Sequence, residues 1–428
     1  MARLGPIYEN ARALPAAVTG MKHARSGETR DPASRVAKSC DAKHSGCVAR
    51  QARDNAGFAA PGAGLIAQGA NASFMPSIEM AVSDDLPWLC RIPSFTGKER
   101  ALCDALQERL SASLPLSSPI RRYGDSLVVP LSRSTGGPKI ALVGQLDVCE
   151  TGQQEVSVVG DRVIAPGAAD MKSGLSVMLA VAQAPPKRAD VTLVFHARGE
   201  LGFDGSELGP VIEHDGDLRQ LDMALVLKPS DNKLQLGSGG STQATVGFRG
   251  RPGHSGLPGT GPNAIHRFAN VLSKITGFSA APDVVDGLTW YETLSVTSAQ
   301  GGRGGRIVPG NFEVNVHHAY GPSTDTHKSQ DMLLALVDRT AALRFEELSE
   351  PAAPNRSHPL IQRLQESGVR GVEARQTWTE VARFTALGVA AANFGPGPER
   401  AAHSRDEFAD IAEIEAAHAI LVRWLEQD

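Results

Sequence analysis

Cysteine is scarce in this sequence. The 428 residues include only five cysteines, at irregularly spaced positions (Cys40, Cys47, Cys90, Cys103 and Cys149). An odd number at irregular spacing does not fit the disulfide frameworks on which small secreted domains depend. The cysteine content therefore excludes that class and predicts a protein of the reducing cytoplasm.

Long apolar runs and a surplus of one charge are also lacking. A membrane-spanning helix needs about 18 or more consecutive apolar residues, and no run here reaches that length. The formal net charge is −4, from 43 basic and 47 acidic side chains, so the basic surplus typical of nucleic-acid binding is missing. We therefore expect neither a membrane nor a nucleic-acid partner. The length and a hydrophobic content of 41% predict two domains.

Residues 1–79 lack the periodicity of helices and strands. They are rich in Ala, Gly and Ser and more basic than acidic, which predicts a disordered extension. A start codon assigned too far upstream would explain this segment, because Met75 and Met80 lie just before folded-looking sequence. An organelle transit peptide is an open alternative. A metal-binding knot of Cys40, His44 and Cys47 is another.

Polar residues follow two apolar strand segments, with a helical segment between the strands. The segment 139–144 leads into Asp147, and the segment 191–195 leads into a turn that contains Glu200. Between them, Asp170 precedes an apolar helical stretch. This alternation predicts an α/β sheet with its site at the carboxyl ends of the strands. We expect the three carboxylates to converge there.

The order of these motifs resembles that of the two-zinc amidohydrolases that include succinyl-diaminopimelate desuccinylase, acetylornithine deacetylase and aminoacylase. The motifs Gly-His-x-Asp, Asp-Met-Lys-x-Gly and Asp-Glu-Glu-x-Gly of that family stand here in altered or intact form (Gly144-Gln-Leu-Asp147, Asp170-Met-Lys-Ser-Gly174 and Arg198-Gly-Glu-Leu-Gly202). The resemblance covers residues 84–426. It implies a mixed, mainly parallel α/β sheet flanked by helices, of the zinc-exopeptidase type.

The resemblance also implies an inserted lid. From residue 242 the pattern changes to alternating strands and helices, and the family has a ferredoxin-like α+β lid and dimerisation domain at this place. We therefore expect a homodimer formed through the lid. The predicted parts are an extension, a catalytic-type domain in two pieces and the lid between them (1–79, 80–241 with 344–428, and 242–343).

For the metal site, the resemblance implies that one of two sites survives. Its ligands would be Asp170, Glu200 and His403, holding one zinc ion, with cobalt or manganese as alternatives. The other site keeps only Asp170, because Gln145 replaces a histidine and Lys228 replaces an acid. A charged ammonium cannot ligate a metal, and a neutral amide is a poor substitute for imidazole. We therefore predict one ion rather than two.

Residues with other catalytic roles in the family are partly altered. Gly199 stands at the general base, whose loss typically costs about 10²- to 10⁴-fold in rate. Asp147 would orient Gln145, the residue two before it, and His254 matches a lid histidine that reaches the scissile carbonyl across a dimer. Lys228 could polarise a bound carbonyl, or could merely neutralise an anionic cluster that has lost its metal.

The positions that contact substrate in the family are altered as well. Ala319 stands where an arginine clamps a substrate carboxylate, and Arg306 stands where the family has asparagine. The resemblance implies substrate-binding positions at Arg306 and Arg383. The first two changes argue against succinylated diaminopimelate, the substrate of the desuccinylase in lysine and diaminopimelate biosynthesis.

Three functions are compatible with this sequence. The first is a metal-dependent amidohydrolase that cleaves an N-acyl amide of an amino acid, with one metal and a shifted substrate. The second is a catalytically inactive paralogue that binds a ligand or partners an intact homologue. The third is a relative recruited to another acyl reaction, such as amide formation. Metal content separates the first from the second, and assays on N-acyl amino acids separate the first from the third.

Overall fold

The computed structural model describes residues 82–113, 118–133, 135–152, 155–339 and 341–427. All described residues belong to one compact unit, Phe74–Asp428. The predicted extension and the candidate knot of Cys40, His44 and Cys47 lie outside the described residues. Within the described ranges, no helix is both long and apolar enough to span a bilayer.

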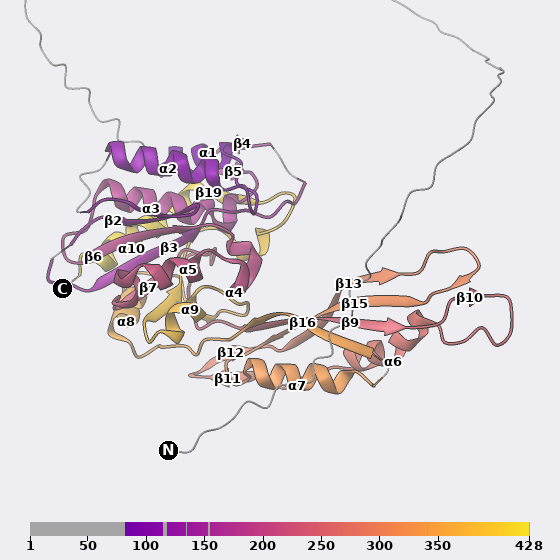
Figure 1. Ribbon diagram of the computed structural model, residues 1–428. Coiled ribbons are helices and arrows are strands. Elements are labelled where there is room, and N and C mark those ends of the chain that lie inside the picture. The colour runs from indigo at the N-terminus through magenta and orange to yellow at the C-terminus, as the bar shows by residue number, and fades with distance from the viewer. Residues whose placement is uncertain (1–81, 114–117, 134, 153–154, 340, 428) are drawn as a thin grey trace, which may run out of the picture. The chain divides into compact units, whose positions relative to one another are not determined.

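An eight-stranded mixed sheet forms the centre of the larger domain (Figure 1). Its strand order is β1-β2-β6-β3-β7-β18-β8-β17. The central strand β3 (Lys139–Gln145) pairs in parallel with β6 (Asp190–His196) and β7 (Met223–Val226), and β7 pairs in parallel with β18 (Ala390–Asn393). The other four strands lie toward the two edges of the sheet (β1 Arg121–Tyr123, β2 Ser126–Pro130, β8 Leu234–Leu236 and β17 Val372–Ala374). The parallel centre places several carboxyl strand ends along one edge.

Both faces of this sheet are buried. Successive side chains of a strand point to opposite faces, so each central strand contributes residues to two apolar clusters. Ile140 and Leu142 of β3 belong to one apolar cluster, whereas Ala141 and Val143 belong to another. The first cluster includes residues of five α-helices (α1 Val82–Arg91, α2 Arg100–Ser113, α3 Ser173–Gln183, α8 Pro359–Glu366 and α10 Ile411–Leu425). The second includes residues of α5 (Leu208–His214) and α9 (Val381–Ala386). Near-continuous apolar strands are typical of such a doubly covered sheet.

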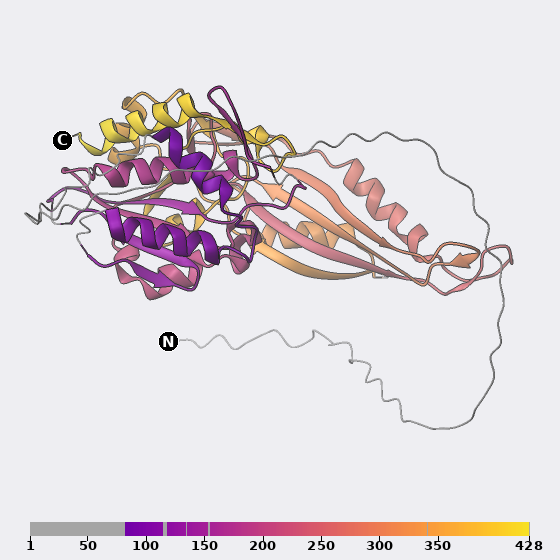
Figure 2. The same ribbon diagram turned by 90° about the horizontal axis from the view of Figure 1, so that it is seen from above.

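Helices from the two ends of the domain meet on one face of the sheet. The C-terminal helix α10 contacts both α3 and α1, and Figure 2 shows this yellow helix beside the indigo and magenta ones. The helix α2 begins after the sequence Thr96-Gly-Lys-Glu99, where Glu99 Oε1 accepts a hydrogen bond from the N–H of Gly97 at 2.8 Å. The packing of α10 on α1 and α3 shows that the chain returns to its first domain after the inserted lid.

The lid is a four-stranded antiparallel sheet with two helices. Its strand order is β13-β15-β9-β16, and its elements are short to medium in length (β9 Gly240–Arg249, α6 Ala264–Thr276, β13 Thr293–Gly301, β15 Asn311–Tyr320, α7 Thr326–Leu336 and β16 Ala341–Ser349). Both helices pack on β9. The last strand runs past the predicted lid boundary at residue 343, since Ala341, Leu343 and Phe345 pack against the lid core with the period of a strand.

The remaining elements are short. They include hairpins, small strands and single helical turns (β4 Ser157–Val159, β5 Arg162–Ile164, α4 Gly202–Gly205, β10 Gly253–His254, β11 Asp283–Val285, β12 Leu288–Trp290, β14 Ile307–Val308 and β19 Phe408–Asp410). The predicted fold class is confirmed: a mixed, mainly parallel sheet is flanked by helices and carries an inserted α+β lid.

Candidate functional site

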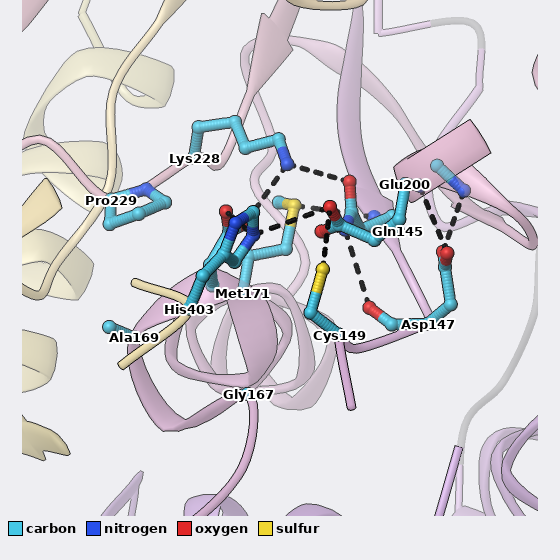
Figure 3. Close-up of polar contacts among 12 residues, drawn as sticks. Gln145, Asp147, Cys149, Gly167, Ala169, Met171, Glu200, Lys228, Pro229 and His403 are labelled. Atoms are coloured by element: carbon cyan, nitrogen blue, oxygen red, sulfur yellow. Dashed lines mark hydrogen bonds and ion pairs between the residues drawn. The ribbon is translucent and has the colours of Figure 1, made fainter. Parts of the chain in front are cut away.

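Five polar residues from separate segments meet at the carboxyl edge of the main sheet (Figure 3). Gln145 is the last residue of β3, Lys228 follows β7, and Glu200 lies in the turn after β6. Asp170 lies in the turn that precedes α3, and His403 lies in the loop before β19. Parallel strands end at a common edge, which explains why segments up to 258 positions apart, from Gln145 to His403, converge here.

Two of the three distances among the predicted metal ligands are close to those found around a single ion. His403 Nε2 is 3.5 Å from Asp170 Oδ2 and 3.3 Å from Glu200 Oε2. Ligand atoms about 2.0–2.1 Å from a tetrahedral zinc ion lie about 3.3 Å from one another. His403 therefore lies near the ligand spacing from each carboxylate, and the binding of one ion by all three residues stays a prediction.

The position expected for a second ion is filled by an ammonium group. Lys228 Nζ donates to Gln145 Oε1 at 2.7 Å and to Asp170 Oδ1 at 3.0 Å, and Gln145 Nε2 donates to Glu200 Oε1. Burial opposes the charge on Lys228, but the carboxylates of Asp170 and Glu200 outweigh it and raise the pKa of the ammonium. A permanent cation at this point does not fit a second metal ion. The residues around this position therefore do not offer a ligand set for a second ion, and a single ion stays a prediction.

The two carboxylates are held in their ionised forms. Burial alone would raise the pKa of Asp170, but the charge of Lys228 and the hydrogen bond from His403 hold it well below its ordinary range. The same two neighbours lower the pKa of Glu200 against its burial. Hydrogen bonds to Asp170, Cys149 and Glu200 raise the pKa of His403 to about 12. A divalent ion that binds here therefore competes with a proton on His403.

The turn that carries Asp170 is fixed by a buried carboxylate. The carboxylate of Glu407 accepts hydrogen bonds from three main-chain N–H groups of that turn. They belong to Gly167, Ala169 and Asp170, at 2.9, 3.1 and 2.8 Å. Burial raises the pKa of Glu407 to about 7, against the effect of these hydrogen bonds. The position of the Asp170 side chain thus depends on a residue close to His403 in sequence.

Asp147 orients the opposite side of the site. Its carboxylate accepts hydrogen bonds from the N–H groups of Gly199 and Glu200 at 2.6 and 2.9 Å and from Thr96 Oγ1 at 3.1 Å. Gln145, which we expected this carboxylate to hold, donates instead to the main-chain carbonyl of Asp147 at 3.3 Å. Burial raises the pKa of Asp147 to about 6. Asp147 therefore positions the turn of Glu200 rather than the side chain of Gln145.

Gly199, at the place of the family's general base, is packed against Gln145. A Cβ atom added to Gly199 would lie 2.7 Å from Gln145 Cβ, closer than real Cβ contacts allow. The backbone φ of Gly199 is not positive, so the restriction is steric rather than conformational. A side chain at position 199 would therefore require Gln145 to move.

A pocket of about 460 Å³ opens beside the cluster. Its lining combines site residues with side chains of the lid sheet and of the loops after β7 and β17 (Asp170, Glu200, Lys228, His403, Ser241, Gln243, His317, Ala319, Glu347, Arg375 and Trp378 among them). This volume suits a small-molecule ligand. Burial lowers the pKa of His317, so the positive charges at the pocket come mainly from Lys228, Arg375 and His403.

The predicted substrate-binding residues Arg306 and Arg383 and the predicted catalytic residue His254 do not line this pocket. His254 is exposed in β10, which pairs with β14, and the carbonyl of the exposed Arg306 accepts the N–H of Ser255 at 2.8 Å. Arg383 is 8% exposed, donates to the carbonyl of Phe203 and lies with its guanidinium carbon 4.1 Å from the centre of that ring. Burial lowers the pKa of Arg383. The catalytic role of His254 and the substrate-binding roles of Arg306 and Arg383 stay predictions.

Two site residues were missed by the sequence analysis. Cys149 Sγ lies 3.3 Å from Glu200 Oε2, although we used this cysteine only to infer a redox compartment. Its position two residues after Asp147, in the segment that follows β3, was the signal available. Arg375 follows β17, lines the pocket and forms an ion pair with Glu399 at 3.1 Å, and nothing in its sequence context distinguished it.

Comparison with known proteins places this site in a family. A Mycobacterium tuberculosis protein named as a candidate succinyl-diaminopimelate desuccinylase is 31% identical over 349 residues, which is 79% of this chain and 96% of the relative. The succinyl-diaminopimelate desuccinylase of Corynebacterium glutamicum is 26% identical, with 79% and 94% covered. An M20 family metallo-carboxypeptidase from Sulfolobus solfataricus has a similar fold, with a TM-score of 0.67 at 16% identity over 80% of this chain and 98% of that one. Residues 141–427 match Peptidase family M20/M25/M40, and the chain belongs to that family.

Proposed function

We propose that this chain is an amidohydrolase that uses one divalent metal ion and cleaves the N-acyl amide of an amino acid. The observation that carries the proposal is the spacing of Asp170, Glu200 and His403, whose donor atoms lie 3.3–3.5 Å apart around His403 Nε2. Relatives named as desuccinylases and a neighbour named as a metallo-carboxypeptidase support metal-dependent cleavage of an amide. Zinc suits this donor set, with cobalt or manganese as alternatives.

The bound ion would lower the pKa of a water molecule and polarise the acyl carbonyl. The protein's own cation would contribute at the same place, because Lys228 lines the pocket and two hydrogen bonds fix its ammonium group. A positioned positive charge stabilises the negative charge that develops on a carbonyl oxygen during acyl transfer. Lys228 would thus take over part of the electrostatic role that a second ion has in a two-metal site.

A lower rate than that of a two-metal enzyme follows from the missing base. Gly199 offers no carboxylate, and loss of a positioned base typically costs about 10²- to 10⁴-fold. The carboxylate of Glu200 remains next to the proposed ion, but Gln145 donates to one of its oxygens. We therefore expect slow turnover, with substrate positioning and electrostatics supplying most of the acceleration.

The pocket favours a small substrate with one carboxylate. Ala319 of β15 lines the pocket but carries no charged group. Among the described residues, Arg375 is the arginine that lines the pocket. Because Arg375 also pairs with Glu399, it can bind one substrate carboxylate but is already partly neutralised. We infer an N-acyl amino acid with an uncharged acyl group as substrate, rather than a succinylated one.

We also infer a homodimer formed through the lid. His254 and Arg306 are exposed and lie close together where β10 pairs with β14, and they do not line the pocket of their own chain. In a dimer they could serve the pocket of the other subunit. Sedimentation analysis tests this inference, and a monomer at assay concentrations would contradict it.

The proposed activity is tested by metal removal and restoration. Protein stripped with a chelator should hydrolyse N-acetyl and N-formyl amino acids only after one equivalent of zinc per chain is added. The variant His403→Ala should lose this activity, whereas His327→Ala, which changes an exposed lid histidine, should keep it. Hydrolysis that persists in the chelator would contradict the proposal, as would absence of turnover across the panel with one ion bound.

A second candidate is a catalytically inactive binding protein. One observation favours it: Lys228 and His403 already balance the charges of Asp170 and Glu200, so the cluster is neutral without an ion. This candidate predicts that N-acyl amino acids raise the unfolding temperature of metal-free protein without being cleaved. Hydrolysis of the same ligands would exclude it.

A further inference from the structure

Cys149 lies at the proposed ion position on a firmly held piece of backbone. The preceding residue, Val148, forms a β-bridge with Phe95. The N–H of Val148 donates to the carbonyl of Ser94 at 3.0 Å, and the carbonyl of Val148 accepts from the N–H of Thr96 at 3.4 Å. These contacts fix the direction in which the chain leaves β3. The thiol of Cys149 consequently points toward Glu200 and His403, as Figure 3 shows.

The distances around Cys149 match those of a metal ligand. The donor atoms of Cys149, Glu200 and His403 all lie within 4.8 Å of one another, and Sγ is 3.3 Å from Glu200 Oε2. A tetrahedral ion with bonds of about 2.3 Å to sulfur and about 2.0 Å to oxygen separates the two ligand atoms by about 3.5 Å. Glu200 Oε2 is thus near the ligand spacing from both the thiol and the imidazole.

We propose that Cys149 is a ligand of the single metal ion, in a mixed sulfur, nitrogen and oxygen site completed by Glu200, His403 and Asp170. This inference rests on the proposed one-metal function and adds a ligand to it. Asp170 can take part because its two oxygens face different neighbours: Oδ1 receives the ammonium of Lys228 at 3.0 Å, and Oδ2 faces His403 at 3.5 Å.

Charge balance supports the same assignment. Cysteine binds metals as a thiolate, so the site would hold three negative charges, on Cys149, Asp170 and Glu200. A divalent ion together with the ammonium of Lys228 supplies three positive charges. A buried cluster is tolerated when its charges are paired in this way. Without the thiolate, the ion and Lys228 would leave one positive charge in excess.

The added sulfur determines which metal the site selects. Thiolate is a soft ligand that favours zinc and cobalt, whereas sites for manganese and magnesium are built from carboxylates, carbonyls and water. The proposal therefore narrows the choice of ion to zinc or cobalt and predicts weak binding of manganese. The other described cysteines, Cys90 and Cys103, are buried in the apolar core and cannot supply a ligand there.

The test is spectroscopy on the full chain loaded with one equivalent of zinc or cobalt. Zinc K-edge absorption should show one sulfur neighbour at about 2.3 Å, and the cobalt form should show a thiolate charge-transfer band in the near ultraviolet. Both signals should be absent in Cys149→Ser and present in Cys103→Ala. Loss of a residue that only supports a ligand typically lowers metal affinity about 10- to 100-fold. The zinc affinity of Cys149→Ser should fall by more than this.

The outcomes separate this inference from the function on which it rests. One bound ion with only nitrogen and oxygen neighbours in the wild type would overturn the role of Cys149 and leave the one-ion amidohydrolase standing. A wild type that binds neither zinc nor cobalt would overturn both. Because the wild-type spectra decide the matter by themselves, poor folding of Cys149→Ser would not prevent the test.

Discussion

Replacement of Lys228 by methionine tests whether its ammonium group is the cation that the site needs in place of a second ion. Lys228→Met keeps most of the side-chain volume and removes the charge. The side chains of Lys228 and Asp170 are 10% and 7% exposed, and their charged atoms are 3.0 Å apart. The substitution therefore leaves a buried carboxylate without its principal partner and Gln145 without a donor to Oε1.

The expected loss of stability follows from this geometry. Removal of one member of a buried ion pair costs about 3–5 kcal/mol. His403 remains 3.5 Å from the other oxygen of Asp170, so we expect the lower end, about 3 kcal/mol in metal-free protein. Lys233→Met is the matched control, because Lys233 pairs with Glu373 at 2.9 Å with side chains 39% and 38% exposed. Exposed pairs contribute about 0–1 kcal/mol.

Urea unfolding in the presence of a chelator measures both losses. We expect the difference between the two variants to shrink when zinc is present, because the ion supplies positive charge to Asp170 in the folded state only. Equal free energies of unfolding for Lys228→Met and Lys233→Met would refute the idea that the ammonium group neutralises the cluster.

The other predictions concern packing, pH and restoration of the second site. Gly199→Ala should lose about 1–3 kcal/mol through overpacking against Gln145, whereas Gly216→Ala, with nothing near its Cβ, should lose far less in the same unfolding assay. Burial lowers the pKa of His196 to about 4, so on acidification the unfolded state, near its ordinary pKa of about 6.5, takes the proton first. Between pH 7.5 and pH 5 the wild type should therefore lose about 2 kcal/mol relative to His196→Gln, and parallel stability curves would contradict this. The combined substitutions Gln145→His, Gly199→Glu and Lys228→Glu should raise bound zinc from one toward two ions per folded chain, and unchanged content would show that these positions do not correspond to the second site.

Much of the main domain could be predicted because its sequence signals are local. The alternation of Ile140 and Leu142 with Ala141 and Val143 already describes a strand covered on both sides. The intact Asp-Met-Lys-x-Gly turn at Asp170 fixes the register of the flanking motifs, so the order of the elements followed. The end of the lid was predicted too early, because the weak apolar alternation of β16 is hard to distinguish from the end of a helix.

The site could be predicted only where a motif carried it. The convergence of Asp170, Glu200 and His403 follows from motif order, but the contact of Cys149 depends on loop geometry. Arg198 and His403 have φ values of 59° each, a left-handed conformation that no propensity predicts at these residues. The burial of Arg383 against Phe203 likewise depends on packing between distant segments, which spacing along the chain does not reveal.

Elemental analysis of the full chain, after equilibration with excess zinc and removal of unbound ion, tests the account most directly. The cluster offers one set of ligands and one ammonium-filled position, so we predict one zinc per chain in the wild type and none in His403→Ala. Two zinc ions per wild-type chain would show that Lys228 leaves its position and that the one-ion site is wrong. A zinc-free wild type would show that Asp170, Glu200 and His403 form an ion-pair cluster rather than a metal site.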